Sequence, residues 1–421
     1  MIDTQTQARI DAWLNGAYDE DSKQEIRDRL ARGEEKEVVD AFYKDLEFGT
    51  GGLRGTMGPG TNRINRYTIG MATQGLYNYL AASFPGETIK VAVAHDSRNG
   101  SPEFARVTAD VLSANGAQVY FFTELRPTPE LSFAVRELGC HSGVVITASH
   151  NPKEYNGYKA YWNDGAQMIA PHDKNVIAEV QKISDLGQVN FDRVEANVHP
   201  ILEEIDRKYL DRVAELSVDP ALIKRQQDLS VVFTPIHGTG ITLVPRVLER
   251  FGFTNVHVVA EQATPDGNFP TVVYPNPEEH EAMRMALEEA KIRNADLVMA
   301  TDPDADRVGS GVKNHRGEWQ LLNGNQTAAL IFYYVLEAWQ QAGKLRGQEY
   351  IVKTIVTTDL LGKIAAHYGV AHHEVLTGFK YIAAVMAEQE GKATFVAGGE
   401  ESYGYLVGDF VRDKDAVISC A

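Results

Sequence analysis

One order of elements occurs three times along the chain, and this repeat constrains the fold more than any other feature of the sequence. Each copy has an apolar run that predicts a buried strand, then an amphipathic stretch that predicts a helix, then a second apolar run. The copies span residues 89–125, 229–261 and 350–377. Because strand, helix and strand in this order form a βαβ unit, the sequence predicts consecutive, similar α/β domains.

Another apolar strand follows each copy and runs directly into a loop that is dense in reactive side chains. The three loops are TASHNP at 147–152, DPDADR at 302–307 and GGEESYG at 398–404. In open α/β sheets, ligands bind beyond the carboxyl ends of the strands. We therefore expect the chemistry to reside in these loops, with a cleft between the domains bringing them together.

The length of the chain also favours several domains. A chain of 421 residues exceeds what one hydrophobic core usually organises. Residues 5–46 carry apolar positions at helical spacing and predict two amphipathic helices, which lead to a glycine-rich turn, FGTGGLRGTMG, at 48–58. We predict a helical extension and three domains, with these bounds: 1–46, 47–204, 205–322 and 323–421.

Charge and composition exclude several classes of protein. The formal net charge of −17, without a basic stripe interleaved with aromatic residues, argues against a nucleic-acid partner. No signal peptide or long apolar segment is present, so no membrane partner is expected. The two cysteines, Cys140 and Cys420, lack metal-ligand or redox spacing, which fits a reducing compartment. We therefore expect a cytoplasmic protein.

Ser149 is the candidate nucleophile. It follows a strand directly, and His150, Asn151 and Pro152 turn the chain away, so the hydroxyl is presented on a loop. Lys159 lies ten residues further on and could return to the same site as a proton donor or a phosphate clamp. A simple turn around the serine and a surface lysine are the structural alternatives.

The DPDADR loop is the candidate metal site. Asp302, Asp304 and Asp306 alternate after an apolar strand, and carboxylate oxygens without sulfur or nitrogen ligands favour Mg²⁺. Arg307 and Lys313 stand where a calcium-binding EF-hand loop needs glycine and glutamate. A solvated acidic turn is the alternative, although three unpaired carboxylates this close repel one another.

Two further segments suit a phosphorylated sugar. Glu400 and Ser402 offer a carboxylate and a hydroxyl at a strand end, which can bind sugar hydroxyls. Arg54 lies in a glycine-rich loop that suits a bidentate phosphate contact. Each of these segments could also be an ordinary turn.

Taken together, these motifs, their order and their spacing resemble the α-D-phosphohexomutase superfamily, in particular its phosphoglucomutase and phosphomannomutase branch with a long N-terminal extension. The resemblance covers almost the whole chain, and PDGNFPTVVYPNPE at 265–278 is also typical of this branch. It implies three consecutive similar α/β domains with mixed sheets around a central cleft. A fourth, C-terminal domain of the family, with a phosphate-binding loop, is expected to be absent here.

The resemblance also implies roles for individual residues. Ser149 would carry the transferable phosphate and complete a Mg²⁺ site with Asp302, Asp304 and Asp306. His150 would lie beside the phosphoserine, and Lys159 would act as acid or base. The positions that match phosphate or sugar contacts in the family are Arg54, Arg307, Glu400, Ser402, Lys414, Thr377, Gly378 and Lys380.

The implied reaction interconverts glucose 1-phosphate and glucose 6-phosphate, or the mannose phosphates, through a phosphoserine and a hexose 1,6-bisphosphate. Glucose 1,6-bisphosphate is the expected activator, and a small phosphosugar is the expected partner. The alternatives are a phosphopentomutase, a glucose 1,6-bisphosphate synthase, a metal-dependent phosphatase, and a phosphosugar-binding fragment impaired by the lack of the fourth domain. The sequence does not predict the oligomeric state.

Overall fold

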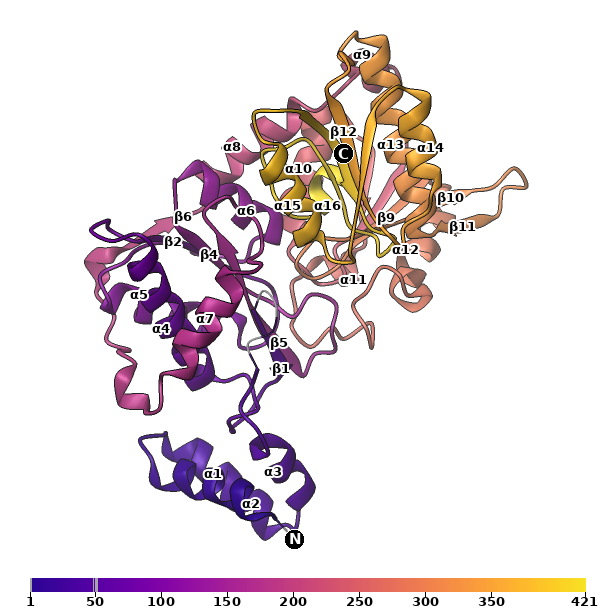
Figure 1. Cartoon of the computed structure of the whole chain (residues 1–421). Helices are drawn as coiled ribbons and strands as arrows, with labels where there is room; N and C mark the ends of the chain where they lie inside the picture. The colour runs from indigo at the N-terminus through magenta and orange to yellow at the C-terminus, as the bar shows by residue number, and fades with distance from the viewer. Residues whose placement is uncertain (1, 48, 50–51) are drawn as a thin grey trace.

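The computed structural model describes residues 2–47, 49 and 52–421, and Figure 1 shows their arrangement. Residues 48, 50 and 51 of the predicted glycine-rich turn lie outside the described residues. The N-terminal helices form a separate layer at one end of the molecule, and three α/β domains follow it in chain order (Figure 1).

The N-terminal segment forms three helices between residues 4 and 42, so the prediction of two helices over residues 5–46 was wrong. The helices are α1 (Thr4–Asn15), α2 (Glu20–Ala31) and α3 (Glu35–Phe42). Asp19 caps α2, because its side chain accepts the N–H of Ser22 at 2.7 Å. Gly33 adopts φ +77°, a left-handed conformation that glycine tolerates, and it separates α2 from α3.

The first domain contains a six-stranded mixed sheet in the order β1-β5-β4-β2-β3-β6. The antiparallel pairs are β1 with β5 and β5 with β4, and the remaining pairs are parallel. The strands are β1 (Gly52–Thr56), β2 (Lys90–His95), β3 (Gln118–Phe122), β4 (Ser142–Ile146), β5 (Tyr155–Trp162) and β6 (Val198–Ile201). The helices are α4 (Arg66–Ser83), α5 (Ser101–Ala114), α6 (Thr128–Glu137) and α7 (His172–Gln181).

The second domain contains a five-stranded mixed sheet in the order β11-β10-β9-β7-β8. Strands β8, β7 and β9 are parallel, whereas β10 runs antiparallel to both of its neighbours. The strands are β7 (Val231–Thr234), β8 (Val256–Val258), β9 (Leu297–Thr301), β10 (Val308–Lys313) and β11 (Trp319–Leu322). The helices are α8 (Glu203–Ala214), α9 (Pro220–Arg225), α10 (Gly240–Phe251), α11 (Ala260–Ala263) and α12 (His280–Arg293).

The third domain contains a four-stranded mixed sheet in the order β13-β12-β14-β15, in which only the β14–β15 pair is antiparallel. The strands are β12 (Glu349–Thr354), β13 (Ala371–Val375), β14 (Thr394–Gly399) and β15 (Tyr405–Val407). The helices are α13 (Gly324–Gln341), α14 (Leu360–His367), α15 (Phe379–Gln389) and α16 (Ala416–Cys420). The predicted three α/β domains with mixed sheets are therefore confirmed.

Each sheet uses the predicted βαβ unit and places a reactive loop at the end of one strand. The units are β2-α5-β3, β7-α10-β8 and β12-α14-β13. The TASHNP, DPDADR and GGEESYG loops follow or overlap the ends of β4, β9 and β14 respectively. The exact domain boundaries given by the sequence remain predictions. In the described part of the chain, no helix is both long enough and apolar enough to cross a membrane.

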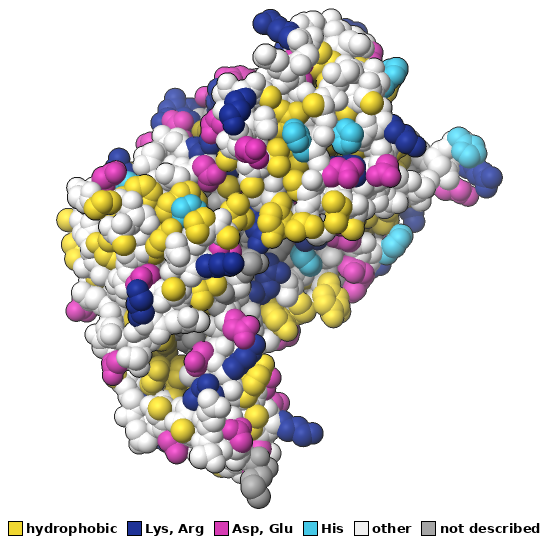
Figure 2. Space-filling view, viewed as in Figure 1, with side chains coloured by type: hydrophobic (Ala, Val, Ile, Leu, Met, Phe, Trp, Pro, Cys, Tyr) yellow, Lys and Arg dark blue, Asp and Glu magenta, His cyan; other side chains and the backbone are white. Residues whose placement is uncertain are grey.

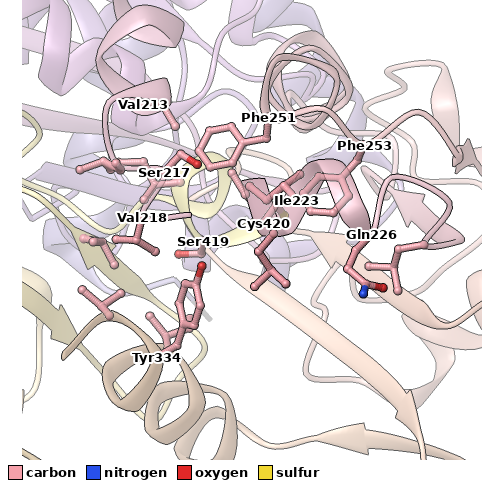
Figure 3. A pocket seen from close by; sticks show the side chains of 18 residues that line it. Val213, Ser217, Val218, Ile223, Gln226, Phe251, Phe253, Tyr334, Ser419 and Cys420 are labelled. Carbon is pink, nitrogen blue, oxygen red and sulfur yellow. The ribbon is translucent and has the colours of Figure 1, made fainter. Parts of the chain in front are cut away.

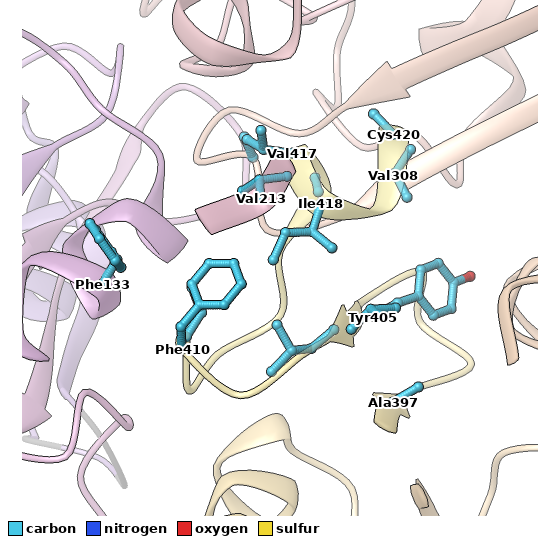
Figure 4. Close-up of a cluster of buried hydrophobic side chains, with 14 of the residues drawn as sticks. Phe133, Val213, Val308, Ala397, Tyr405, Phe410, Val417, Ile418 and Cys420 are labelled. Atoms are coloured by element: carbon cyan, nitrogen blue, oxygen red, sulfur yellow. The ribbon is translucent and has the colours of Figure 1, made fainter. Parts of the chain in front are cut away.

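One apolar cluster contains residues of all three domains. Phe133 of α6 contacts Tyr209 of α8 and Phe410 of the segment after β15, with ring centroids 5.6 and 6.1 Å apart. Figure 4 shows Phe410 between Phe133 on one side and Val213 and Val417 on the other. Because these side chains come from different domains, burying them fixes how the three sheets are oriented relative to one another.

We expect the Phe133→Ala substitution to destabilise the folded protein by about 3–5 kcal/mol, because it leaves a cavity where three domains meet. The thermal unfolding midpoint should fall accordingly. Ile292→Ala is a suitable control, because Ile292 is 81% exposed and a surface change of this kind costs about 0.5 kcal/mol or less. Equal midpoints for the two variants would contradict a shared interdomain core.

Candidate active site

Ser149 lies at the meeting point of the first and second domains. It follows β4, it is only 3% exposed, and its N–H donates to Thr147 Oγ1 at 2.8 Å. Its Oγ lies 3.1 Å from Asp302 Oδ2 and 3.1 Å from His150 Nδ1. The hydroxyl is therefore held between a carboxylate of the second domain and a ring nitrogen of its own loop.

Each of the three reactive loops contains a residue other than glycine in the left-handed backbone conformation. Ser149 has φ +55°, Ala305 has φ +51° and Tyr403 has φ +67°. Such a conformation costs a residue with a side chain about 1–2 kcal/mol. These conformations persist only where the surroundings over-determine them, and they are common at functional sites.

The three predicted metal ligands form one buried cluster. Asp302, Asp304 and Asp306 each offer a carboxylate oxygen, and these oxygens lie within 4.8 Å of one another. Asp302 Oδ1 accepts the backbone N–H of Asp306 at 3.1 Å and that of Arg307 at 3.0 Å, which closes the loop on itself. The alternating spacing in the sequence therefore does bring the carboxylates to one point.

Two lysines from the other domains neutralise this cluster. Lys159 of β5 contacts Asp304 at 2.7 Å and Asp306 at 3.2 Å, and Lys414 of the third domain contacts Asp306 at 2.8 Å. Burial opposes the charge of each lysine, but the adjacent carboxylates outweigh it and raise both lysine pKa values. Lys159 belongs to an inner strand between β1 and β4, so the alternative of a surface lysine is wrong.

The carboxylates divide into two kinds. Burial and the nearby charges of Asp306 and Asp304 raise the pKa of Asp302 well above its ordinary value. Burial acts on Asp304 and Asp306 as well, but the ammonium groups of Lys159 and Lys414 prevail and lower both pKa values. Asp302 is thus the member of the cluster that holds a proton most readily.

The cluster fits a divalent cation. Asp304 Oδ1 and Asp306 Oδ1 are buried and have no hydrogen-bond partner within the described structure. Buried carboxylate oxygens are seldom left without partners, and an all-oxygen donor set is the kind that Mg²⁺ prefers. These two oxygens, together with Asp302, are therefore suited to bind such an ion.

Two further predicted residues flank Ser149. Burial, and then the positive charge of Arg307, lowers the pKa of His150 to about 3, so its ring is neutral near pH 7. Arg54 of β1 is exposed and donates to Asn151 Oδ1 at 3.2 Å. Its guanidinium therefore reaches the same loop from the solvent side.

The third domain contributes a carboxylate next to these cations. Glu400 is buried at the end of β14 and accepts the N–H of Gly378 at 2.8 Å. Burial raises the pKa of Glu400, and the charges of Lys414 and Arg307 offset part of this increase. The Gly378 contact ties the predicted TGFK turn to the GGEESYG loop.

Three predicted residues of the third domain remain. Thr377 is exposed, Ser402 is partly buried in the GGEESYG loop, and Lys380 lies 5.2 Å from the centroid of the Tyr381 ring. Their predicted contacts with a ligand remain untested.

Three residues that the sequence did not single out hold the site together. Thr128, at the start of α6, donates its N–H and its hydroxyl to the backbone and side chain of Asp304, both at 2.9 Å. Glu278 accepts from Arg307 at 2.7 Å. Asp413 accepts from Tyr161 at 2.7 Å and precedes Lys414. Of these three residues, only Thr128 could have been located from the sequence, because a Thr-Pro pair is typical of the start of a helix.

The surface and the pockets add two observations. Lys and Arg side chains gather where the first domain meets the other two (Figure 2). A pocket of about 460 Å³ lies between α8, α9, α10, α13 and α16, and its lining includes Phe251, Phe253 and Tyr334 (Figure 3). None of its lining residues belongs to the candidate site, so we assign it no part in the chemistry.

The arrangement can bind a cation and an anion side by side. A hydroxyl lies beside three carboxylates, two ammonium groups and a neutral imidazole, in a place largely excluded from water. Fixed charges of this kind are worth more in such an environment than in bulk water. The arrangement therefore suits the transfer of a strongly anionic group to or from the hydroxyl.

Comparison with known proteins gives consistent matches. Sequence models of the phosphoglucomutase/phosphomannomutase family match as alpha/beta/alpha domain I at residues 45–186, domain II at 207–317 and domain III at 323–421. The expectation about a fourth domain concerns residues beyond these matches and remains a prediction.

Two curated relatives and one solved structure illustrate the similarity. A phosphoglucomutase of Staphylococcus epidermidis is 36% identical over 397 residues, which are 93% of this chain and 71% of that protein. A protein named "Probable phosphoribomutase" of Schizosaccharomyces pombe is 35% identical over 99% of this chain and 72% of its own length. A phosphoglucomutase/phosphomannomutase family protein of Burkholderia thailandensis shares the fold, with a TM-score of 0.69, 21% identity, and coverage of 88% of this chain and 74% of that one.

We expect the His150 ring of the unphosphorylated protein to stay neutral at about pH 5, where an ordinary histidine is mostly protonated. Burial and the charge of Arg307 both disfavour the imidazolium form. Nitrogen NMR of histidine-labelled protein measures this directly, and the His150→Gln variant assigns the signal. An imidazolium signal from His150 at that pH would contradict this electrostatic picture.

Proposed function

The chain belongs to the phosphoglucomutase/phosphomannomutase family, and from this premise we propose that it is a phosphohexomutase that transfers a phosphoryl group through Ser149. Its substrates would be glucose 1-phosphate and glucose 6-phosphate. The observation that carries the proposal is the position of Ser149 Oγ, 3.1 Å from both Asp302 and His150. A buried hydroxyl placed between an acidic cluster and a neutral ring nitrogen is arranged for group transfer rather than for capping a turn.

The proposed cycle has two transfers. In the first, a hydroxyl of the hexose monophosphate attacks the phosphorus of phosphorylated Ser149, the bond from phosphorus to Ser149 Oγ breaks, and a hexose 1,6-bisphosphate forms. In the second, the bisphosphate presents its other phosphate, and Ser149 Oγ attacks it and releases the isomeric monophosphate. Lys159 holds and moves the proton that the attacking hydroxyl loses and the departing oxygen gains.

Positive charge makes these transfers feasible. Mg²⁺ would be held by Asp302, Asp304 and Asp306 together with a phosphate oxygen on Ser149. When bound, it would offset the negative charge that develops on the phosphoryl group. Arg54 would contact the transferred phosphate from the solvent side of the loop. Fixed cations in a water-poor site contribute to this stabilisation without having to reorganise.

Sugar recognition would fall to the third domain and its neighbours. We assign contacts with the sugar or its phosphate to the following residues: Arg307, Thr377, Gly378, Lys380, Glu400, Ser402 and Lys414. The position of Glu400 beside Lys414 and Arg307 supports this assignment. The carboxylate can accept hydrogen bonds from sugar hydroxyl groups, while the two cations can bind the phosphate of the same ligand. Glucose 1,6-bisphosphate would act as activator by phosphorylating Ser149. The cytoplasmic location remains a prediction.

A second candidate substrate is a pentose phosphate. The relative named "Probable phosphoribomutase" matches 99% of this chain at 35% identity, against 93% of the chain at 36% identity for the phosphoglucomutase. The same serine chemistry would serve both sugars, so the choice depends on the sugar contacts. We keep the hexose as the first proposal and the ribose as the alternative.

We expect the protein, with Mg²⁺ and a trace of glucose 1,6-bisphosphate, to convert glucose 1-phosphate into glucose 6-phosphate. Phosphorus NMR measures this conversion. Ribose 1-phosphate in a parallel sample decides between the two sugars. Ser149→Ala should lose all conversion because the acceptor oxygen is gone. Release of inorganic phosphate instead of an isomeric sugar phosphate would indicate a phosphatase and contradict the proposal.

We further predict that Asp304→Asn weakens Mg²⁺ binding at least about tenfold in calorimetric titration, because it removes one ligand charge. Asp110→Asn is the matched control, since Asp110 pairs with Arg193 outside the site. Affinity should increase as the pH rises, because the raised pKa of Asp302 lets a proton compete with the metal at low pH. Equal affinity for both variants would contradict the ligand assignment.

A further inference from the structure

Arg98 is a buried residue that touches the nucleophile loop directly but has no place in the function proposed above. It follows β2, and its side chain is fully buried. Its guanidinium donates to four backbone carbonyl oxygens: those of Ser149, Asn151, Pro152 and Tyr155, with distances of 2.6 Å to Ser149, 2.9 Å to Pro152 and 3.1 Å to Tyr155. One side chain therefore binds the whole turn from Ser149 to the first residue of β5.

These contacts match the chemistry of the guanidinium group. Arginine carries five N–H donors in a rigid planar fork, and here the two terminal nitrogens each serve two carbonyl groups. The remaining nitrogen, Nε, lies 3.3 Å from Asp96 Oδ2. Asp96 itself is held by the Ser101 hydroxyl at 2.6 Å and by the Arg98 N–H at 2.9 Å. Asp96 therefore pairs with the guanidinium as a buried ion pair, without a hydrogen bond to Nε.

The second domain closes over the other side of Arg98. The ring of Phe269 lies 5.1 Å from the guanidinium carbon of Arg98, within the range of a cation–π contact. Next to it, Asn99 donates to the side chain of Asn268 at 3.0 Å. A Cβ added to Gly267 would lie 2.2 Å from the backbone nitrogen of Asn99, so this segment packs against the first domain without room for a side chain.

We propose that Arg98 is a positioning residue that holds Ser149 in its left-handed conformation, and that Phe269 couples this geometry to the docking of the second domain. The inference rests on the proposed function in one respect, namely that Ser149 accepts a phosphoryl group. Ser149 reaches Asp302 only when the first and second domains are docked, and the Phe269 contact forms across the same interface. Arg98 therefore links the shape of the loop to the presence of the acidic cluster.

The experiment measures how fast Ser149 gains a phosphoryl group from glucose 1,6-bisphosphate with Mg²⁺, by mass spectrometry of quenched samples. The full chain is compared with its Arg98→Gln, Arg98→Lys and Phe269→Leu variants. Phe191→Leu is the matched control, since Phe191 also packs against an arginine, Arg66 at 5.6 Å, but it does so remote from the nucleophile loop. Hydrogen exchange of the 147–155 peptide is followed in the same proteins.

A displacement of the reacting oxygen by about 1 Å can lower a rate about 100-fold, so Arg98→Gln should reduce the maximal rate by about that factor. The concentration of glucose 1,6-bisphosphate that gives half the maximal rate should change less than about twofold, because Arg98 does not touch the assigned sugar contacts. Arg98→Lys should restore part of the rate through its single ammonium group, and Phe269→Leu should lose about threefold to tenfold. Exchange of the 147–155 peptide should be faster in all three variants and unchanged in Phe191→Leu.

The outcomes separate this inference from the function on which it rests. If the unaltered protein is never phosphorylated, the proposed function fails, and the hydrogen-exchange result alone then decides whether Arg98 holds the loop. The positioning role is wrong if the unaltered protein is phosphorylated and the variants do not differ from it. That outcome means that Phe269→Leu and both Arg98 variants have the same phosphorylation rate and the same hydrogen exchange as the unaltered protein. If Arg98→Gln does not fold, Phe269→Leu still decides, because an unchanged rate and unchanged exchange in that variant overturn the proposal.

Discussion

Three carboxylates buried at one point need positive charge nearby, and the cations that lie closest to them come from the other two domains. Within the described residues, Lys159 comes from the first domain and Lys414 from the third, and both contact Asp306 of the second. A buried charge without a partner costs several kcal/mol, so the carboxylates can be buried here because the docked domains bring these lysines to them. The site and the interdomain packing are therefore one structure.

The same constraint explains how the scaffold is built around the cluster. The end of β4, the end of β9 and the end of β14 each supply a loop, and each loop contains a residue in the left-handed conformation. The start of α6 donates to Asp304, and Asp413 is fixed to the first domain by Tyr161. The apolar core around Phe133 and Phe410 holds the domains at the orientation in which these polar contacts form. Loop strain is tolerated because the surroundings leave no alternative.

Much of this could be predicted from the sequence, because the signals are local. The three βαβ units, the three reactive loops and the convergence of Asp302, Asp304 and Asp306 all follow from periodicity and spacing. The N-terminal segment has three helices instead of the two predicted, because Asp19 caps α2 and Gly33 separates α2 from α3. A capping aspartate and a glycine between two helices are local features of the sequence as well.

Other features could not be predicted, since they depend on how the domains dock. Nothing in the sequence near Glu278 indicates that it pairs with Arg307, and nothing near Arg98 indicates that its guanidinium serves four carbonyl groups of a segment about fifty residues away. The neutral state of His150 likewise depends on burial and on Arg307 of another domain. Pairings of this kind belong to the assembled structure, and no single motif contains them.

In the mechanism we propose, Ser149 carries a phosphoryl group that the sugar can remove. The most direct test is to incubate the protein with glucose 1,6-bisphosphate and Mg²⁺, remove the small molecules, and record the intact mass before and after adding glucose 1-phosphate. We expect a gain of about 80 Da, mapped to the Ser149 peptide, that disappears on addition of the monophosphate as bisphosphate forms. A protein that gains no mass, or a phosphate on Ser149 that the monophosphate cannot remove, would contradict it.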